Sequence, residues 1–408
     1  MSAPEQKQIL FVDDDPEILG GLRVRLHRLG SRVGMRFAIS GQAAIEELER
    51  YDCDLIIADV RMPGMDGVEL LQTVSERWPH TIRIALSGYA GERKVIRLVP
   101  YAHQYLNKPC PSPRLEEVIG RCLGLHELLP DPHLRAIAGS VRTLPVTIRA
   151  HTELQAALSH QNPAIGAVAA IIASDTGLTA KTLQLANSEF FRLGRRITNI
   201  EQAVGHLGLA VMRGLASSNE ALWRGAEHEG VTLRLEELQH HVAAVAAGAR
   251  SLAEETPHAD DAWAAGLLHD VGYWILARDR QPDLLRCLQL AAAEALPQHE
   301  AERRLLRASH AQLGAYLLGL WGIPDPVVEA VAFHHAPRRA EHAQFGCLEA
   351  VTVAQSLCAT DDAEIFHGRS AADPDVDAAY LKAVNAPFDW AEATRRVEAS
   401  CRSLETRS

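Results

Sequence analysis

The sequence lacks the features of a secreted or membrane-bound chain. Its 408 residues include seven cysteines, an odd and scattered set without a Cys-X-X-Cys pair, which suits a reducing compartment better than a disulfide framework. No apolar run reaches the length needed to cross a bilayer, and the first residues are polar rather than a signal segment. We therefore expect a cytoplasmic protein with no membrane partner.

Positive charge is also scarce. Lys and Arg number 41 against 52 Asp and Glu, for a formal net charge of −11. Because Lys and Arg carry phosphate binding, this balance argues against general coating of nucleic acid, and no basic helix-turn-helix pattern is present, so no specific nucleic-acid partner is expected. The length exceeds one ordinary core and predicts two or three domains.

One stretch organises the first part of the chain. The apolar residues 55–58 end on Asp59, and a turn-forming Met-Pro-Gly-Met-Asp-Gly segment follows at residues 62–67. A short apolar run bounded by turn signals is typical of a strand buried on both faces of a parallel sheet. Reactive groups in such sheets lie at the carboxyl ends of the strands. Asp59 is therefore a metal ligand, a nucleophile, or the N-cap of a helix.

Strand and helix patterns alternate through residues 1–125. Strands are expected at 8–12, near 33–37, at 55–59, 81–87 and 105–107, with helices after the first strand and at 41–49, 68–78 and 113–123. This alternation predicts an α/β fold with a doubly wound, five-stranded parallel sheet.

In that fold the strand ends gather Asp13, Asp14, Asp59, Ser87 and Lys108 at one edge. Clustered carboxylates repel one another, so we expect them to hold a hard cation, and Mg²⁺ accepts such ligands. Asp59 could then act as a nucleophile toward a phosphoryl group, which the Lys108 ammonium would steady and the Ser87 hydroxyl would hydrogen-bond.

These residues and motifs resemble the receiver domain of bacterial response regulators, a flavodoxin-like fold. The resemblance implies phosphorylation of Asp59 by a histidine kinase and Mg²⁺ held by Asp13, Asp14, Asp59 and the backbone carbonyl of Arg61. It also implies a switch read out by Ser87 and Tyr105. The alternative is a receiver fold that has lost phosphorylation. Pro100 interrupts the expected fourth helix, which predicts that this helix is short or displaced.

Prolines interrupt the helical pattern after Leu125, and we therefore place a linker at 126–136. Beyond it the Ala- and Leu-rich spacing predicts an all-helical region, as at 164–173, 178–187 and 240–253. We assign 137–345 to one helical domain and 346–408 to a helical extension packed on it. Ser174, Asp175 and Thr198 are expected N-caps, and Glu201 would complete a capping box with Thr198.

A set of histidines marks this second region. They are His241, the pair His269-Asp270, His310, and the pair His334-His335. Imidazoles and a carboxylate converging from several helices can ligate a transition metal. The ordered array resembles the HD superfamily of metal-dependent phosphohydrolases, and residues 134–360 resemble its output-domain branch, HDOD.

The HD resemblance implies a vestigial or retained site for Fe or Mn. Against catalysis, Gln355 stands where a further Asp would close the metal site, and an amide is a poor replacement for a carboxylate ligand. In addition, Tyr273 replaces the Lys of the Gly-Tyr-Pro enzymes, and no Gly-Tyr-Pro follows His335. The histidines are then either a hydrogen-bonded relic in a signalling scaffold or a working metal site.

Together the two resemblances predict a phosphorelay response regulator whose receiver controls an HDOD domain that acts by contacting a downstream signalling protein. The alternative is a receiver-gated metal phosphohydrolase. A homodimer is left open.

Overall fold

The computed structural model describes residues 6–27, 33–88, 98–188, 191, 196–217, 223–224, 235–340, 342–358 and 376–405. The segment expected to hold the fourth receiver helix, residues 95–103, begins outside this set, because residues 89–97 are not described. Among the described residues, no helix is both long and apolar enough to span a membrane.

A five-stranded parallel sheet forms the first domain, as predicted. Its strands are β1 (Lys7–Val12), β2 (Val33–Ala38), β3 (Leu55–Asp59), β4 (Ile82–Ser87) and β5 (Gln104–Asn107). Their order is β2-β1-β3-β4-β5, with every neighbouring pair parallel. β3 and β4 are buried along their whole length, because helices cover both faces of the sheet.

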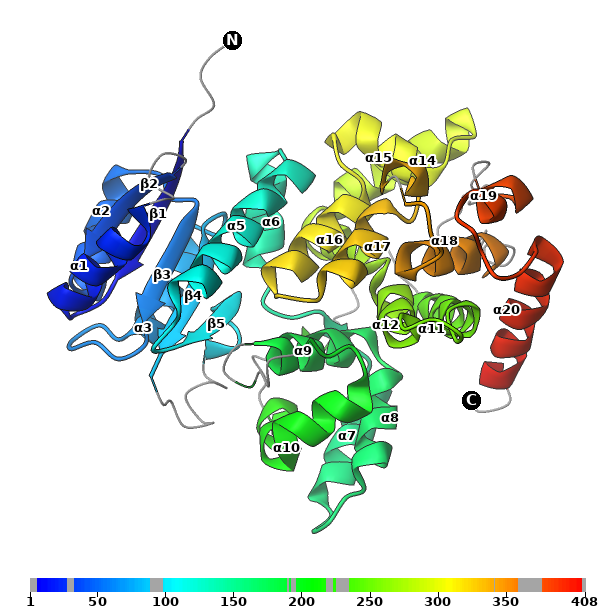
Figure 1. Ribbon diagram of the computed structural model, residues 1–408, viewed down its shortest axis with the longest axis horizontal. Coiled ribbons are helices and arrows are strands. Elements are labelled where there is room, and N and C mark those ends of the chain that lie inside the picture. Colours follow the sequence, from blue (N-terminus) through cyan, green and yellow to red (C-terminus); the bar gives the residue numbers. More distant parts are fainter. Residues whose placement is uncertain are drawn as a thin grey trace.

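Alternate residues of each strand pack against different helices. Ile9 and Phe11 of β1 share a core with α1 (Pro16–Arg25) and α5 (Ser112–Leu128). Leu10 and Val12 share a second core with α2 (Gly41–Arg50) and α3 (Gly67–Arg77). Figure 1 shows the resulting layers, with α5 on the side of the sheet that faces the rest of the chain.

The rest of the described chain is helical apart from one short strand pair. The helices are α6 (Pro132–Ser140), α7 (Ile148–Ser159), α8 (Ile165–Ala173), α9 (Thr176–Asn187), α10 (Ile200–Ser217), α11 (Leu235–Leu252), α12 (Ala259–Leu268), α13 (Val271–Asp279), α14 (Gln281–Glu294), α15 (Gln298–Leu306), α16 (His310–Leu320), α17 (Asp325–Phe333), α18 (Cys347–Cys358), α19 (Ala378–Ala383) and α20 (Trp390–Glu405), with a 3-10 turn at Pro337–Ala340. The exception to the all-helical prediction is the parallel pair β6 (Pro145–Val146) and β7 (Trp223–Arg224).

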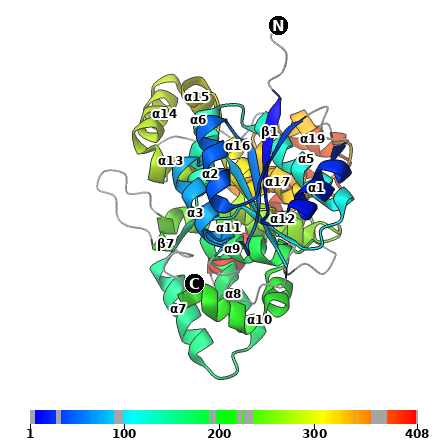
Figure 2. The ribbon, with the colours of Figure 1, turned by 90° about the vertical axis from the view of Figure 1, so that its left-hand side faces the viewer.

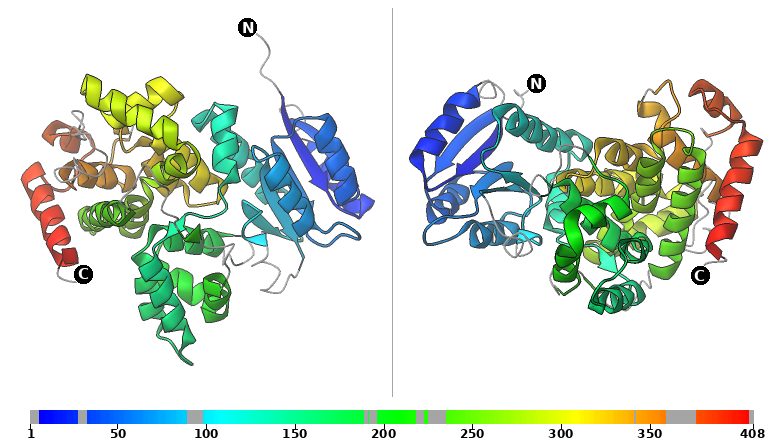
Figure 3. Two further views of the ribbon diagram at one scale, coloured as in Figure 1. Left: turned by 180° about the vertical axis from the view of Figure 1, so that it is seen from behind. Right: turned by 60° about the horizontal axis from the view of Figure 1, so that its bottom comes forward.

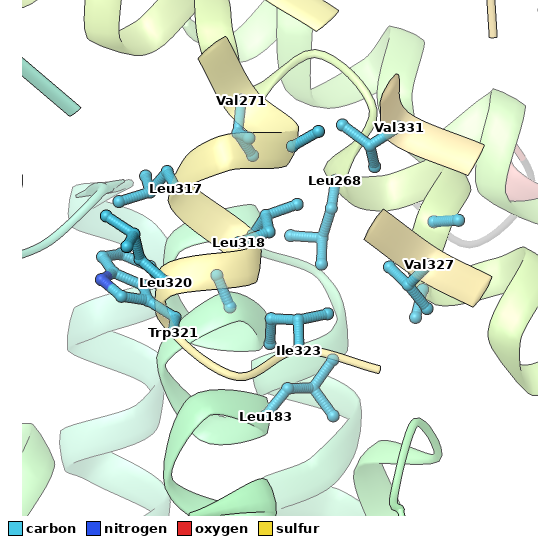
Figure 4. Close-up of a cluster of buried hydrophobic side chains, with 14 of the residues drawn as sticks. Leu183, Leu268, Val271, Leu317, Leu318, Leu320, Trp321, Ile323, Val327 and Val331 are labelled. Atoms are coloured by element: carbon cyan, nitrogen blue, oxygen red, sulfur yellow. The ribbon is translucent and has the colours of Figure 1, made fainter. Parts of the chain in front are cut away.

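The core of the helical region is centred on α16, whose residues from His310 to Leu320 are buried except Gln312. Figure 4 shows Leu318 directed toward Leu268 of α12, near Val327 and Val331 of α17, while Leu317 and Trp321 lie on the other side of α16. Helices α7, α8 and α10 project to one side, and α20 lies at the end remote from the sheet (Figures 2 and 3). α18, the first helix of the predicted extension, is also largely buried and packs against α11, α12 and α17.

Two local expectations differ from the structure. Residues 126–136 hold the end of α5 and the start of α6, with only 129–131 between them. The cap of α10 is Asn199, whose side chain accepts from the Gln202 N–H at 3.0 Å. Thr198 instead donates its hydroxyl to Asp261 Oδ1 at 2.7 Å, so the predicted capping box with Glu201 is wrong. Asp175 does cap α9.

The receiver and the helical region are packed against each other. Arg83 of β4 is 2% exposed and donates to Gly139 O of α6 at 2.6 Å and to Tyr101 O at 2.7 Å. On the other side, Gln104 donates to Gly319 O at 3.4 Å. A Cβ at Gly139 would lie 2.1 Å from Pro79 O. The close approach of α6 therefore requires glycine.

Substituting Gly139 tests this packing. We expect Gly139→Ala to lower the free energy of unfolding by about 1–3 kcal/mol, because the methyl group must push α6 from the receiver backbone. Denaturant unfolding followed by circular dichroism measures the change. The control is Gly120→Ala in α5, where a Cβ meets nothing within 4 Å and helix propensity predicts a gain of about 0.5–1 kcal/mol. Equal effects of both substitutions would contradict the close packing.

Lys181 of α9 is a buried cation beside this junction. It is 1% exposed, donates to Arg142 O at 2.7 Å and Gln184 Oε1 at 2.8 Å, and lies 4.4 Å from the centroid of the Trp321 ring. Burial lowers the pKa of Lys181 to about 7. Between pH 7 and the ordinary lysine range, the unfolded state therefore binds more protons than the folded state, and stability rises with pH.

Lys181→Met removes this pH-dependent cost. The free energy of unfolding of the variant minus that of the wild type should be most positive below pH 7 and should fall as pH rises toward 10, by up to about 1.4 kcal/mol per pH unit. Urea titrations at several pH values give the difference. Lys382→Met, at an exposed lysine of α19, is the control. A difference that stays constant with pH would contradict the lowered pKa of Lys181 in the folded state.

Candidate functional sites

The structure brings the three receiver aspartates together at the carboxyl edge of the sheet. Asp59 is the last residue of β3, and Asp13 and Asp14 follow β1 directly. One carboxylate oxygen from each lies within 4.8 Å of the others. Asp13 and Asp59 are buried and Asp14 is exposed. This set of oxygen donors, open to solvent on one side, suits Mg²⁺.

Lys108 joins two of these carboxylates. Its Nζ lies 2.5 Å from Asp13 Oδ2 and 2.8 Å from Asp59 Oδ2. Burial alone would lower the pKa of Lys108, but the hydrogen bonds to Asp13 and Asp59 and the charges of both raise it. The lysine is thus protonated beside the Asp59 carboxylate.

Ser87, Arg61 and Tyr105 are the other three residues predicted for this site. Ser87 ends β4, and its carbonyl accepts from the Lys108 N–H at 2.8 Å. The Arg61 N–H donates to Asp59 Oδ1 at 3.3 Å. Tyr105 lies inside β5, where burial raises the pKa of its hydroxyl and the hydroxyl donates to Ala102 O at 3.4 Å. Tyr105 therefore faces the interior rather than the carboxylates.

Gly67 explains the turn after Asp59. A Cβ at this position would lie 2.2 Å from Asp59 O, so only glycine lets α3 begin directly beneath the end of β3. The Asp66 side chain then caps α3 by accepting from Val68 and Glu69. The turn sequence thereby fixes the backbone that carries Asp59.

The predicted histidines also converge, around Asp270. They come from α11 (His241), the α12–α13 junction (His269), the first residue of α16 (His310), and the end of α17 (His334 and His335). Two groups each have ligand atoms within 4.8 Å of one another: His241, His269 and Asp270 form one, and His310, His334 and His335 form the other. The sequence predicted one array, and the structure resolves it into two halves.

Asp270 lies between the two halves. Its Oδ2 is 3.2 Å from His269 Nε2 and 3.8 Å from His241 Nε2. Its Oδ1 is 3.4 Å from His310 Nε2 and 3.8 Å from His334 Nε2. Each carboxylate oxygen therefore faces a different pair of imidazoles, which is the arrangement of a carboxylate that bridges two cations.

Hydrogen bonds orient three of the imidazoles. His269 Nδ1 donates to Gly266 O at 2.7 Å, and His334 Nδ1 donates to Val331 O at 2.8 Å. In both rings Nε2 then carries the lone pair, and within the described residues this buried atom has no hydrogen-bond partner. Metal-ligating histidines use Nδ1 in this way while Nε2 binds the ion.

Glu302 plays the same part for His310. This glutamate of α15 is fully buried, and its Oε2 is 2.8 Å from His310 Nδ1 and accepts the His310 backbone N–H at 2.7 Å. Burial acts to lower the pKa of His310, but the charges of Glu302 and Asp270 raise it to about 9. Burial acts the other way on Asp270, yet His269 and His310 hold its pKa well below the usual range.

The sequence interpretation missed Glu302 and His299, and it named Tyr273 only as a departure from the Gly-Tyr-Pro enzymes. The Tyr273 ring stacks on His310 at a centroid distance of 3.9 Å, and His299 stacks on His335 at 4.3 Å. Gly272 has a steric role, since a Cβ there would lie 1.9 Å from His310 O. The His-Asp-X-Gly spacing could have revealed Gly272, but no sequence pattern indicates Glu302.

The donor set fits one or two transition-metal ions. Imidazole nitrogens and a shared carboxylate are ligands for Fe, Mn or Zn. Among the described residues, the Nε2 atoms of His269 and His334 form no hydrogen bond and face the Asp270 carboxylate. Gln355 lies on α18, which packs against α11 and α12, and its Oε1 is likewise buried without a hydrogen-bond partner in the described chain. A neutral amide thus occupies the helix where a further carboxylate was sought.

Comparisons with known proteins divide the chain in the same way. A family model for the response regulator receiver domain matches residues 9–120, and one for the HDOD domain matches residues 144–337.

Among curated relatives, the hydrogenase transcriptional regulatory protein HoxA of Cupriavidus necator is 33% identical over 32% of this chain and 27% of its own length. Sensor protein GacS of Pseudomonas syringae is 28% identical over 53% of this chain and 24% of its own. The chain spans less than half the length of these relatives.

Among solved structures, the MmoQ response regulator of Methylococcus capsulatus is 22% identical and covers 62% of this chain and 98% of its own, with a TM-score of 0.48. From the two family matches, the chain consists of a response regulator receiver domain followed by an HDOD domain.

Proposed function

We propose that the chain is a response regulator of a two-component phosphorelay, in which a histidine kinase phosphorylates Asp59 and the modification controls the HDOD domain. The observation that carries the proposal is the joint placement of Asp59 and Lys108, with Nζ 2.8 Å from the carboxylate. Asp59 would attack the phosphorus of a phosphohistidine while the bond from phosphorus to the imidazole nitrogen breaks.

Each neighbouring group has a role in this reaction. Mg²⁺, held by Asp13, Asp14, Asp59 and the Arg61 carbonyl, would neutralise the charge that gathers around the transferred phosphoryl group. Lys108 would bind one phosphoryl oxygen, and Ser87 would hydrogen-bond another after transfer. The similarity of the receiver part to sensor proteins and transcriptional regulators supports a kinase as the donor.

The output is inferred from the packing between domains. β4 and β5, which carry Ser87 and Tyr105, also carry Arg83 and Gln104, and these two donate to Gly139 O and Gly319 O of the helical region. A shift of the strand ends on phosphorylation would therefore reach the HDOD domain directly. We infer that the HDOD domain then gains or loses contact with a downstream signalling protein.

Asp59→Asn tests the first step. Incubated with a small phosphoryl donor and Mg²⁺, the wild type should acquire one phosphoryl group, and the variant should acquire none because an amide is not a nucleophile here. Phosphate-affinity electrophoresis or intact-protein mass spectrometry gives the readout. Asp52→Asn, at an exposed position ahead of β3, should label like the wild type. Labelling of the Asp59 variant would refute the assignment.

A second function is favoured by the orphaned His269 and His334 nitrogens. The HDOD domain would hold Fe or Mn between the two histidine groups and act as a phosphohydrolase of the HD type. A bound ion, when present, would polarise a phosphate oxygen. Asp270 would share its oxygens between the two positions, and Glu302 would keep His310 Nε2 directed at the ion. The amide of Gln355 weighs against turnover, though not against binding.

Metal content decides whether this second site works. Protein loaded with Mn²⁺ or Fe²⁺ and then desalted should retain metal by elemental analysis. His269→Ala should remove most of it, and Glu302→Gln should weaken retention about 10- to 100-fold by freeing the His310 ring. His258→Ala, at a partly exposed histidine outside both groups, is the control.

Protein that retains no metal would exclude the hydrolase. If metal-loaded protein hydrolyses a nucleotide or cyclic dinucleotide, and Asp270→Ala removes this activity, the hydrolase function is established. The proposal that the HDOD domain acts only by contacting another protein would then be wrong.

A further inference from the structure

A pocket lies between the two domains, away from both sites described above. Its receiver wall is formed by residues near β5 and along α5, including Tyr105, Arg114 and Arg121, and its other wall by the end of α9 and the turn after α16. Its enclosed part has a volume of about 20 Å³, and the rest is open to solvent. The enclosed part therefore has room for little more than a water-sized group, so a phosphoryl group would lie at its open mouth.

The charge of this pocket is opposite to that of the chain. Arg114, Arg121 and Arg196 line it, and none of the described lining residues is acidic, although the formal net charge of the protein is −11. Arg114 also pairs with the half-exposed Glu117, at 2.6 Å. Asp325 reaches toward two of the arginines, at 2.7 Å from Arg196 Nη1 but 3.8 Å from Arg121 Nη1. Its side chain is 60% exposed, so solvent screens much of its charge.

Arg121, which lines the pocket, has one guanidinium donor that no described residue satisfies. Its Nη2 donates to Gln104 Oε1 at 3.0 Å, which ties the guanidinium to β5 of the receiver beside the domain junction. Its Nε is buried and has no hydrogen-bond partner among the described residues. Leaving a charged donor buried and unsatisfied is costly, and burial together with the charges of Arg196 and Arg114 lowers the pKa of Arg121. An anion would relieve both.

Local backbone geometry keeps the space beside Arg121 open. Gly322, in the turn after α16, has a φ of +73°, and a Cβ there would lie 3.4 Å from Arg121 Nη2. A side chain at this position would thus be strained and would press on the guanidinium. Planar guanidinium groups bind the oxygens of phosphates and carboxylates through paired hydrogen bonds, and clustered arginines favour phosphate.

We propose that this interdomain pocket binds a phosphoryl group through Arg114, Arg121 and Arg196, either as inorganic phosphate or as the phosphate of a small organic ligand. The ligand would contact the receiver and the HDOD domain at once and so stabilise their packed arrangement. The site needs no metal ion, which separates it from the two sites of the proposed function.

Isothermal titration of the full-length protein tests the proposal. EDTA is present throughout, so that no metal-dependent site of either domain takes up phosphate, and ionic strength is held constant. Inorganic phosphate and adenosine monophosphate are titrated separately. Saturable binding of one equivalent is expected. Comparison of the two affinities shows whether the pocket prefers inorganic phosphate or an organic phosphate.

Three variants locate the binding. Arg121→Gln should weaken binding at least about tenfold, the loss of one charge-assisted hydrogen bond. Asp325→Asn should strengthen it by a few fold, because it removes the carboxylate that competes for Arg121 and Arg196. Arg149→Gln, which changes an exposed arginine of α7 paired with Glu153, should leave the affinity unchanged.

The proposal is overturned if neither ligand binds saturably up to about 10 mM, or if Arg121→Gln and Asp325→Asn bind as the wild type does. Circular dichroism of each variant separates a lost site from a lost fold. If Arg121→Gln unfolds, the opposite shift expected in Asp325→Asn still decides the question.

Discussion

The burial of Arg83 between the domains is the constraint on which the arrangement of this molecule depends. The guanidinium has left water completely, and it is satisfied by carbonyl groups of Thr81, Tyr101 and Gly139 and by the ring of His103. Within the described residues it forms no ion pair with a carboxylate. If α6 moved away, the group would lose the Gly139 carbonyl and keep its desolvation cost. In the packed arrangement of the receiver and the helical region, backbone carbonyl groups and His103 thus take the place of water around this charge.

Hydrogen bonds between buried polar groups also position the side chains of the histidine cluster. Six potential ligands meet in a nearly dry interior, and each ring that is held firmly is held by its Nδ1 through a backbone carbonyl or, for His310, through Glu302. The carboxylate of Asp270 is the negative group that faces both halves. Small residues allow the approach, since Gly272 lies against the His310 backbone and Gly266 lies against Ala246. The site is therefore built by close packing of helices α11, α12, α13 and α16 as much as by the ligands themselves.

Much of this could be predicted from the sequence. The receiver strands are short apolar runs that end on polar residues, and the carboxyl ends of parallel strands must meet, so the proximity of Asp13, Asp59 and Lys108 follows from the pattern. The histidines could be identified because each begins or ends an apolar helical segment. What could not be predicted depends on tertiary distance. Glu302 precedes His310 by eight residues on a different helix, and nothing in the periodicity of α15 marks it.

Local rules failed where two of them competed. The spacing of Thr198 and Glu201 fits a capping box, but Asn199 is an equally good cap and α10 begins after it, which leaves Thr198 to bond to Asp261. Arg83 presented the same difficulty on a larger scale. A charged residue within a buried strand indicates only that some partner exists, and that partner proved to lie in a helix 56 residues further along the chain.

The position of α5 has a consequence for any molecule that recognises the receiver. One side of this helix is packed on the sheet, and Leu125, toward its end, fits against Gly319 of α16 at a separation that leaves no room for a methyl group. A second receiver, or any other protein that binds the side of α5 facing α16, must first displace the HDOD domain. Its apparent affinity is reduced by the fraction of molecules in which that surface is exposed. The HDOD domain thus competes with other partners for its own receiver. Because both domains belong to one chain, the effective concentration of this competitor does not change when the protein is diluted.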